Sequence, residues 1–364
     1  MPLQPRKAVS KLEAGIHGGY DQAELETLGI TPDEIIDFSV STNPAGTPPG
    51  ILRQVSVKDL TRYPDSQSTF LKREIARISG VSEKNTLVCG GSTGIIRLAV
   101  TAYLGEKDRI LLVEPTYGEY RLSCEIAGAE VNTFLTSEQD DFRPDIDALI
   151  TQIKREKPEI LFLCNPNNPT GYYLKRDEFG EILSAASGSL VVLDEAYISF
   201  VDNDWLSTGY IDTNNLLIVR SMTKDYAIAG LRLGYALAGE EIIRALSRVC
   251  PPWSVNAIAQ KAGITALQNK EYLEKSRELV FREKKYLVSG LVRLGYLCIP
   301  SDANYFLVKV NNAADFRKQL LVEKRILVRD CTSFGLPEYI RIAPRSHHQN
   351  RKLINAIKEL VDDK

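Results

Sequence analysis

The 364-residue chain lacks an excess of basic residues, because its 45 lysines and arginines are matched by 47 aspartates and glutamates. Without such an excess it has little with which to displace counterions from a nucleic-acid backbone, and we exclude a general nucleic-acid-binding protein. Long apolar runs are also missing. Segments such as 110–113 and 190–193 are far shorter than the roughly 20 residues of a membrane span, so we predict no membrane partner.

Closely spaced cysteines are absent as well. The six cysteines, at positions 89, 124, 164, 250, 298 and 331, are scattered along the chain, which excludes the close pairs of zinc sites and redox motifs. We interpret them as small apolar side chains in a reducing compartment. The first 19 residues contain no apolar stretch of the kind that a secretory signal needs. We therefore expect a cytoplasmic protein.

The composition is that of an ordinary globular protein, with 44% hydrophobic and 25% charged residues, and the length is typical of about two domains. Continuous apolar runs alternate with helical patterns between about residues 60 and 250. These runs are 86–89, 109–113, 160–163, 190–193 and 216–219. Such runs are typical of strands that helices cover on both faces. They predict an α/β fold with a three-layer, mostly parallel sheet.

The remaining segments predict a second, smaller α+β domain. Residues 1–50, which end in a stretch rich in Pro and Gly, indicate an arm that also contributes to this domain. We expect the large domain over 51–255 and the small domain over 256–364. In the latter, a long charged helix up to about residue 294 precedes strand-like segments at 304–309 and 339–342 and a terminal helix.

Polar residues follow each apolar run, at the strand ends where open α/β sheets bind their ligands. After 86–89, small residues lead into a helix that begins near Ser92 and Thr93, and the free amides of a helix N-terminus suit a phosphate. A capped helix without a ligand fits the same pattern. Tyr117 follows the second run, where its ring can stack on a planar ligand or simply pack.

The other three strand ends carry an amide, a carboxylate and a lysine. Asn168 lies in the segment Asn-Pro-Asn-Asn-Pro-Thr-Gly, which is too elaborate for a plain connection. Asp194 ends an apolar strand and needs a cation, unless it only caps a helix. Because no His or Cys is nearby, an organic cation such as a protonated ring nitrogen fits, and we predict no metal. Lys224, near Arg232, is a candidate for binding an aldehyde, although most lysines are surface groups.

Together these strand ends offer a phosphate site, a stacking ring, an amide, a buried carboxylate with Tyr197 beside it, and a lysine. Pyridoxal phosphate carries the matching groups: a phosphate, a flat ring, a phenolate oxygen, a ring nitrogen and an aldehyde. We therefore predict pyridoxal phosphate as the cofactor.

With these residues, the sequence resembles the fold type I pyridoxal-phosphate enzymes, the aspartate-aminotransferase superfamily, over nearly its whole length. The resemblance implies an aspartate-aminotransferase-like fold in which Lys224 binds the cofactor covalently and Asp194 pairs with the pyridine N–H. It also implies that Tyr197 and Asn168 contact the phenolate oxygen and that Tyr117 stacks on the ring. The residues implied for the cofactor phosphate are Ser92, Thr93, Ser221 and Arg232.

Two further segments extend the resemblance. Residues 62–65, Arg-Tyr-Pro-Asp, resemble the element whose tyrosine, here Tyr63, reaches the cofactor phosphate of the neighbouring subunit, which implies a homodimer. Arg341 matches the arginine that binds the substrate carboxylate.

Within the superfamily, the segments 62–65, 165–171 and 229–232 are similar to those of histidinol-phosphate aminotransferases and of threonine-phosphate decarboxylases of cobalamin biosynthesis. The decarboxylases also have a His-Gly-Gly arm, here starting at His17, and a second C-terminal arginine, here Arg345. This resemblance implies that His17 and Arg345 bind a substrate phosphate, whereas the alternative for His17 is a turn in the arm.

The first interpretation is therefore an L-threonine O-3-phosphate decarboxylase that forms (R)-1-aminopropan-2-yl phosphate. The alternatives are a histidinol-phosphate aminotransferase, or a related class I/II aminotransferase, and a catalytically silent binding module of the same fold. Both enzymes would act on a small phosphorylated amino acid or amino alcohol. Their reactions differ only in which bond at Cα stands perpendicular to the cofactor ring, and the sequence leaves that geometry open.

Overall fold

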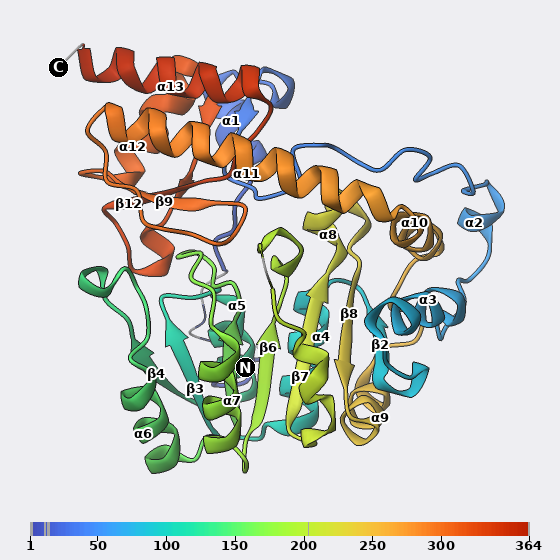
Figure 1. The fold of residues 1–364 in the computed structure, drawn as a ribbon. Helices are drawn as coiled ribbons and strands as arrows, with labels where there is room; N and C mark the ends of the chain where they lie inside the picture. The colour runs from blue at the N-terminus through green and yellow to red at the C-terminus, as the bar shows by residue number, and fades with distance from the viewer. Residues whose placement is uncertain (1–2, 11, 13–14, 203, 363–364) are drawn as a thin grey trace.

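The computed structural model describes residues 3–10, 12, 15–202 and 204–362, and its centre is a seven-stranded sheet (Figure 1). The strand order is β2-β8-β7-β6-β5-β3-β4, and only β8 runs antiparallel to its neighbours. The strands are β2 (Thr86–Cys89), β3 (Arg109–Glu114), β4 (Glu130–Leu135), β5 (Ile160–Cys164), β6 (Leu190–Asp194), β7 (Leu216–Ser221) and β8 (Gly234–Ala238). The predicted mostly parallel sheet is therefore confirmed.

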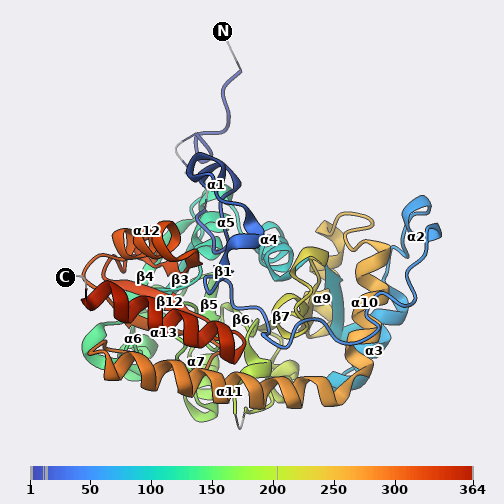
Figure 2. The same cartoon turned by 90° about the horizontal axis from the view of Figure 1, so that it is seen from above.

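Helices cover both faces of this sheet because alternate strand residues point to opposite sides. Leu111, Leu161 and Val191 pack on one face, whereas Leu112 and Phe162 pack on the other. The first face is covered by α3 (Thr69–Ser79), α6 (Ile146–Glu156), α7 (Arg176–Ala185) and α10 (Ala257–Gln268). The second is covered by α4 (Ser92–Tyr103), α5 (Glu119–Ala127) and α9 (Glu240–Val249). Seen from above, the helices α4 and α5 lie across the sheet from α6 and α7 (Figure 2). The expected three layers are present.

A second unit is built around two small sheets. One is antiparallel, in the order β11-β12-β9, and the other is the parallel pair β1-β10. Its strands are β1 (Ile36–Asp37), β9 (Phe306–Lys309), β10 (Ile326–Leu327), β11 (Arg329–Asp330) and β12 (Tyr339–Ile342). Its helices are α11 (Lys270–Arg293), α12 (Ala313–Lys324) and α13 (His347–Asp362). The pairing of β1 with β10 places part of the N-terminal arm in this unit, while the boundaries at residues 50 and 255 stay predictions.

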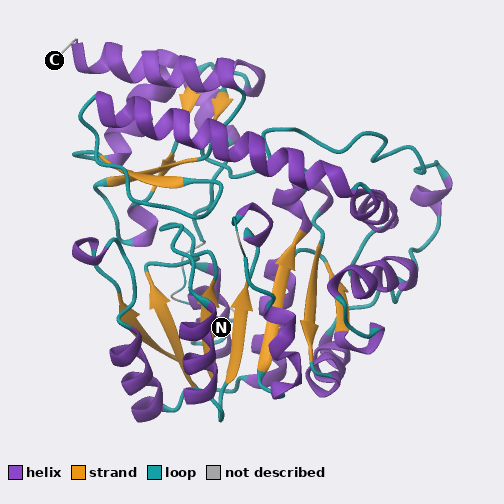
Figure 3. Cartoon of the chain, in the orientation of Figure 1, coloured by secondary structure: helices purple, strands orange, loops and turns teal. Residues whose placement is uncertain are grey.

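The N-terminal arm continues from β1 to the carboxyl ends of the large sheet. The N–H of Asn43 donates to the carbonyl of Lys224 at 3.0 Å, and its side-chain amide donates to the carbonyl of Asp225 at 2.7 Å. The other α-helices of the described residues are α1 (Gln22–Leu28) in the arm, α2 (Lys58–Thr61) between the arm and α3, and α8 (Met222–Asp225) after β7. Figure 3 shows the parallel strands pointing towards the second unit. Within the described ranges, no helix has the length and apolar character that crossing a bilayer requires.

Candidate active site

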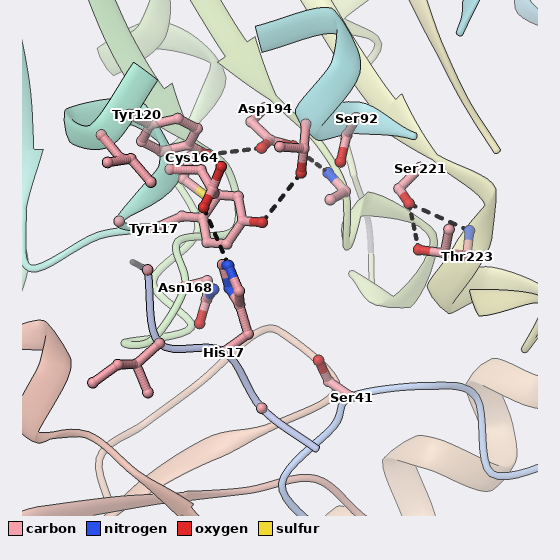
Figure 4. Close-up of a pocket in the computed structure, with 18 of the residues that line it drawn as sticks. His17, Ser41, Ser92, Tyr117, Tyr120, Cys164, Asn168, Asp194, Ser221 and Thr223 are labelled. Atoms are coloured by element: carbon pink, nitrogen blue, oxygen red, sulfur yellow. Dashed lines mark hydrogen bonds and ion pairs between the residues drawn. The ribbon is translucent and has the colours of Figure 1, made fainter. Parts of the chain in front are cut away.

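A cavity of about 1010 Å³ lies at the carboxyl ends of the parallel strands. Its walls come from the strand-end loops, from the N-terminal arm and from the second unit, as the close-up in Figure 4 shows in part. The sequence-predicted residues that line it are His17, Ser92, Thr93, Tyr117, Asn168, Asp194, Tyr197, Ser221, Lys224, Arg232 and Arg341. Side chains from distant parts of the chain are thus brought to one site.

One end of the cavity has the chemistry of a phosphate site. The chain turns at Gly91, whose φ of +87° suits glycine, and α4 then begins at Ser92. A Cβ on Gly234 would lie 2.6 Å from the amide nitrogen of Ser92, so β8 touches this turn directly. The Ser221 and Thr223 hydroxyls lie 2.7 Å apart on the adjoining strand end. Helix amides, hydroxyls and the Arg232 guanidinium therefore surround a space that suits a phosphate.

Asp194 is buried at the end of β6. Its carboxylate accepts hydrogen bonds from the Tyr120 hydroxyl at 2.7 Å and from the Ala196 N–H at 3.0 Å. Burial raises the pKa of this carboxyl to about 6. Because both hydrogen-bond partners are neutral, a cation would be a favourable further partner for the buried carboxylate. A protonated ring nitrogen meets that need.

Tyr120 is a site residue that the sequence did not reveal. It lies in α5, stacks on Phe162 with ring centroids 5.0 Å apart, and meets Tyr117 edge-on at 5.5 Å. Burial raises the pKa of its hydroxyl well above the usual value. Tyr120 therefore keeps its proton and donates a hydrogen bond to Asp194. Its place in the first turn of the helix that follows the Tyr117 loop was the available signal.

Lys224 lies in the short helix α8 directly after β7. Burial, together with the nearby Arg341 and Arg232 guanidiniums, lowers the pKa of its amine to about 8. A lysine with such a pKa has a sizeable neutral fraction near neutral pH and can attack an aldehyde. The adjacent Asp225 is buried, accepts a hydrogen bond from Ser199 at 2.7 Å, and burial raises the pKa of its carboxyl to about 7.

Arg341, in β12, belongs to the part of the cavity wall that the second unit supplies. Its guanidinium donates to the side-chain oxygen of Asn168 and, at 2.9 Å, to the Ser39 carbonyl. It lies over the Tyr305 ring at 4.8 Å, and its buried Nε has no partner in the described part of the chain. This spare donor on a buried cation suits an anionic substrate group. Nearby, the Ser41 hydroxyl donates to the Tyr197 hydroxyl at 3.3 Å.

Tyr117 stands between the phosphate end and the arm. Its hydroxyl lies 3.2 Å from that of Thr93, and burial raises its pKa to about 12. His17 approaches from the arm, with its ring centroid 6.0 Å from the Tyr117 ring, and its Nε2 lies 3.1 Å from Glu119 (Figure 4).

Two of the predicted residues lie elsewhere. The Arg345 guanidinium donates to the carbonyls of Asp37, Val40 and Thr42, and this residue is not part of the cavity wall. Backbone carbonyls of the arm thus engage Arg345 in this structure, although its charge lies near enough to Lys224 to lower the pKa of that amine. The binding of a substrate phosphate by His17 and Arg345 stays a prediction. Tyr63 stacks on Trp253 outside the cavity of its own chain, with ring centroids 4.4 Å apart.

Comparison with known proteins agrees with this fold and site. The aminotransferase class I and II family matches residues 33–359. A histidinol-phosphate aminotransferase of Methanococcus aeolicus is 31% identical and covers 98% of both chains. The solved structure of the Clostridium acetobutylicum histidinol-phosphate aminotransferase has a TM-score of 0.83 and 27% identity over 90% of this chain and 99% of its own. That of the L-threonine-O-3-phosphate decarboxylase from Porphyromonas gingivalis has a TM-score of 0.79 and 27% identity over 89% and 99%.

The chain therefore belongs to the aminotransferase class I and II family. It is a pyridoxal-phosphate-dependent enzyme with the fold of the fold type I superfamily, as the sequence predicted. The buried Asp194 with its neutral partners, the buried Lys224 and the phosphate site at Ser92 fit the three ends of this cofactor. The catalytically silent alternative is set aside, and the relatives support the aminotransferase alternative more than the decarboxylase that sequence analysis placed first.

Proposed function

We propose that the protein is an aminotransferase that exchanges the amino group of histidinol phosphate with 2-oxoglutarate. The observation that carries the proposal is the relation over the whole length to proteins described as histidinol-phosphate aminotransferases. The site supports it, because the Nε of the buried Arg341 on the cavity wall has no hydrogen-bond partner among the described residues. Glutamate or histidinol phosphate would each bring an anionic group to this arginine.

The proposed roles follow the geometry of the site. Bound pyridoxal phosphate supplies an aldehyde for the amine and a protonated ring that withdraws electrons from Cα. Asp194 would keep the ring nitrogen protonated, and Tyr197 and Asn168 would hold the phenolate oxygen. The Lys224 amine, in its neutral form, would be the base that accepts the proton from the substrate Cα. The hydroxyls of Ser92, Thr93 and Ser221 and the guanidinium of Arg232 would bind the cofactor phosphate.

A decarboxylase of threonine phosphate is the second candidate, supported by the 27% identity to the solved decarboxylase. The deciding experiment supplies the purified holoenzyme with histidinol phosphate and 2-oxoglutarate, and separately with L-threonine O-3-phosphate. Glutamate formation in the first mixture without CO2 release in the second is the expected result. Release of CO2 and aminopropanol phosphate, with no glutamate, would overturn the proposal.

The role of Lys224 has its own test. The purified protein should be yellow, and borohydride should fix the cofactor to the chain at Lys224. Lys224→Ala should leave no borohydride-reducible adduct, as mass spectrometry of the reduced protein would show. A wild-type protein that takes up no cofactor, or an adduct that survives in Lys224→Ala, would remove this lysine from the proposed role.

We also propose a homodimer in which Tyr63 reaches the cofactor phosphate of the other subunit. Tyr63 is 79% exposed, and its partner in stacking, Trp253, is 46% exposed. Two large exposed rings outside the cavity of their own chain are typical of a protein interface.

We propose a cytoplasmic location on the ground of the scattered, free cysteines.

A further inference from the structure

A buried carboxylate on the cavity wall has an imidazole ring as its partner. Glu119, the first residue of α5, is only 4% exposed. Its Oε1 lies 3.1 Å from Nε2 of His17, and its Oε2 accepts a hydrogen bond from Arg97 at 3.2 Å. Arg97 thus engages one carboxylate oxygen. The other oxygen, which the His17 ring contacts in this structure, can accept a hydrogen bond from an N–H donor in the cavity.

The His17 ring reaches this place from the N-terminal arm. Two hydrogen bonds hold the arm on either side: Arg329 donates to the Ile16 carbonyl at 2.8 Å, and the Gly19 N–H donates to the Ser39 hydroxyl at 2.8 Å. The side chain of His17 is itself half exposed, at 51%. The ring is therefore held against Glu119 by few contacts and stands at the open side of the cavity.

The surroundings of the His17 ring are those that an imidazole prefers. An aromatic ring, Tyr117, lies beside it at 6.0 Å and a tilt of 49°, and a carboxylate oxygen accepts at its edge. Both neighbours also line the cavity, together with Asn168 and Lys224. Figure 4 shows His17 with Tyr117 and Asn168. A substrate that carries an imidazole could use the same two neighbours, with its ring N–H donating to Glu119.

We infer that Glu119 is the specificity-determining residue that accepts a hydrogen bond from the imidazole ring of the amino donor, and that His17 occupies this place until the donor binds. The inference rests on the proposed function, since it deepens the substrate class of the same site. A buried carboxylate accepts an N–H strongly and, being an acceptor only, offers no hydrogen-bond donor to a carboxylate or phosphate. Glu119 therefore favours a donor with a distal imidazole over one with a distal carboxylate or phosphate.

The first test uses free imidazole as the probe and needs no turnover. Calorimetry on the holoenzyme should show that His17→Ala binds imidazole about ten-fold more tightly than the unchanged protein, because a tethered competitor has been removed. The double variant His17→Ala with Glu119→Gln should lose that gain. The matched control is His347→Ala, which removes a similar His–Glu pair in the second unit, where His347 Nδ1 lies 3.1 Å from Glu283.

The second test measures specificity. In Glu119→Gln, the ratio of kcat/KM for histidinol phosphate to that for glutamate should fall about ten-fold or more, the effect of losing a hydrogen bond to a charged group. An equal loss for both donors, or equal imidazole affinity in all four proteins, would overturn the inference. If the unchanged enzyme fails to transaminate histidinol phosphate, the proposed function is wrong. The imidazole measurement still decides on Glu119 and His17 in that case.

Discussion

At the scale of single residues, the hydrogen bond from Tyr120 favours the ionised form of Asp194. Tyr120→Phe removes only the hydroxyl and keeps the ring that stacks on Phe162. Because the hydroxyl stabilises the ionised form of Asp194 at 2.7 Å, its loss raises the pKa of this carboxyl above about 6. We expect kcat to fall about 10- to 150-fold, for a bond worth about 1.5–3 kcal/mol, and the acid limb of the pH profile to move to higher pH.

The control for this prediction is Tyr286→Phe in the second unit, where the Tyr286 ring packs beside His347 at 4.6 Å. Tyr286→Phe should leave kcat and the acid limb unchanged, because Tyr286 does not line the cavity. An unshifted acid limb in Tyr120→Phe would show that Tyr120 has only a packing role.

Lys224 gives a second prediction at this scale, for the protein stripped of its cofactor. Its amine attacks the cofactor aldehyde only when neutral, and its pKa is lowered to about 8. Below that pH the protonated amine predominates, so the rate of cofactor uptake should rise with pH and level off above about 8. Stopped-flow absorbance between pH 6 and 10 measures the rate. A rate that is flat across this range would contradict the lowered pKa.

At the scale of elements, the phosphate end depends on the close contact between β8 and the start of α4. Gly234→Ala would place a Cβ 2.6 Å from the Ser92 nitrogen and 2.7 Å from the Gly91 carbonyl carbon. Since both atoms are backbone, the turn must shift, and overpacking of this kind costs about 1–3 kcal/mol. We expect a lower melting temperature and weaker cofactor binding, measured by thermal unfolding and by fluorescence titration.

Gly188→Ala is the matched control, because nothing lies within 4 Å of a Cβ at that glycine. It should leave both measurements unchanged. Equal cofactor affinity in Gly234→Ala and Gly188→Ala would show that the turn before α4 does not support the phosphate.

The elements also show what the sequence can predict. The five continuous apolar runs are all strands, because complete burial leaves a clear pattern. The sequence did not predict β4, because it is an edge strand whose apolar run is interrupted by Asn132 and Thr133. It did not predict β8 either, because five small or mixed residues show no distinct hydrophobic pattern. Strand-end positions predicted the cavity wall well. The contact of Tyr120 with Asp194 and the hydrogen bonds of Arg345 to the arm could not be predicted, because the direction of a side chain depends on packing between distant segments.

At the scale of the whole molecule, the proposed dimer makes a prediction about mixed subunits. A Lys224→Ala subunit lacks the amine, and a Tyr63→Phe subunit lacks the hydroxyl that would contact the phosphate of the other site. In a hybrid dimer, the site that keeps Lys224 would receive an intact Tyr63 from the other subunit. Mixing and reassociating equal amounts of the two variants should thus restore activity to about one quarter of the unmutated level, as random pairing requires.

Activity is assayed before and after mixing, with sedimentation to verify the dimer. A mixture no more active than its Tyr63→Phe component would contradict a shared site, and a monomer in sedimentation would contradict the dimer itself.

The pairing of β1 with β10 has a consequence for the order in which a ribosome-bound chain folds. Residues 36–37 are made early, but their partners, residues 326–327, are made near the end. The seven strands of the large sheet lie between residues 86 and 238 and can assemble while synthesis continues. Until β10 emerges, the apolar Phe38 has no cover and the arm cannot bring Asn43 to the Lys224 carbonyl in its final position. The cavity therefore closes last, so an incomplete chain can hold a folded sheet without a finished site.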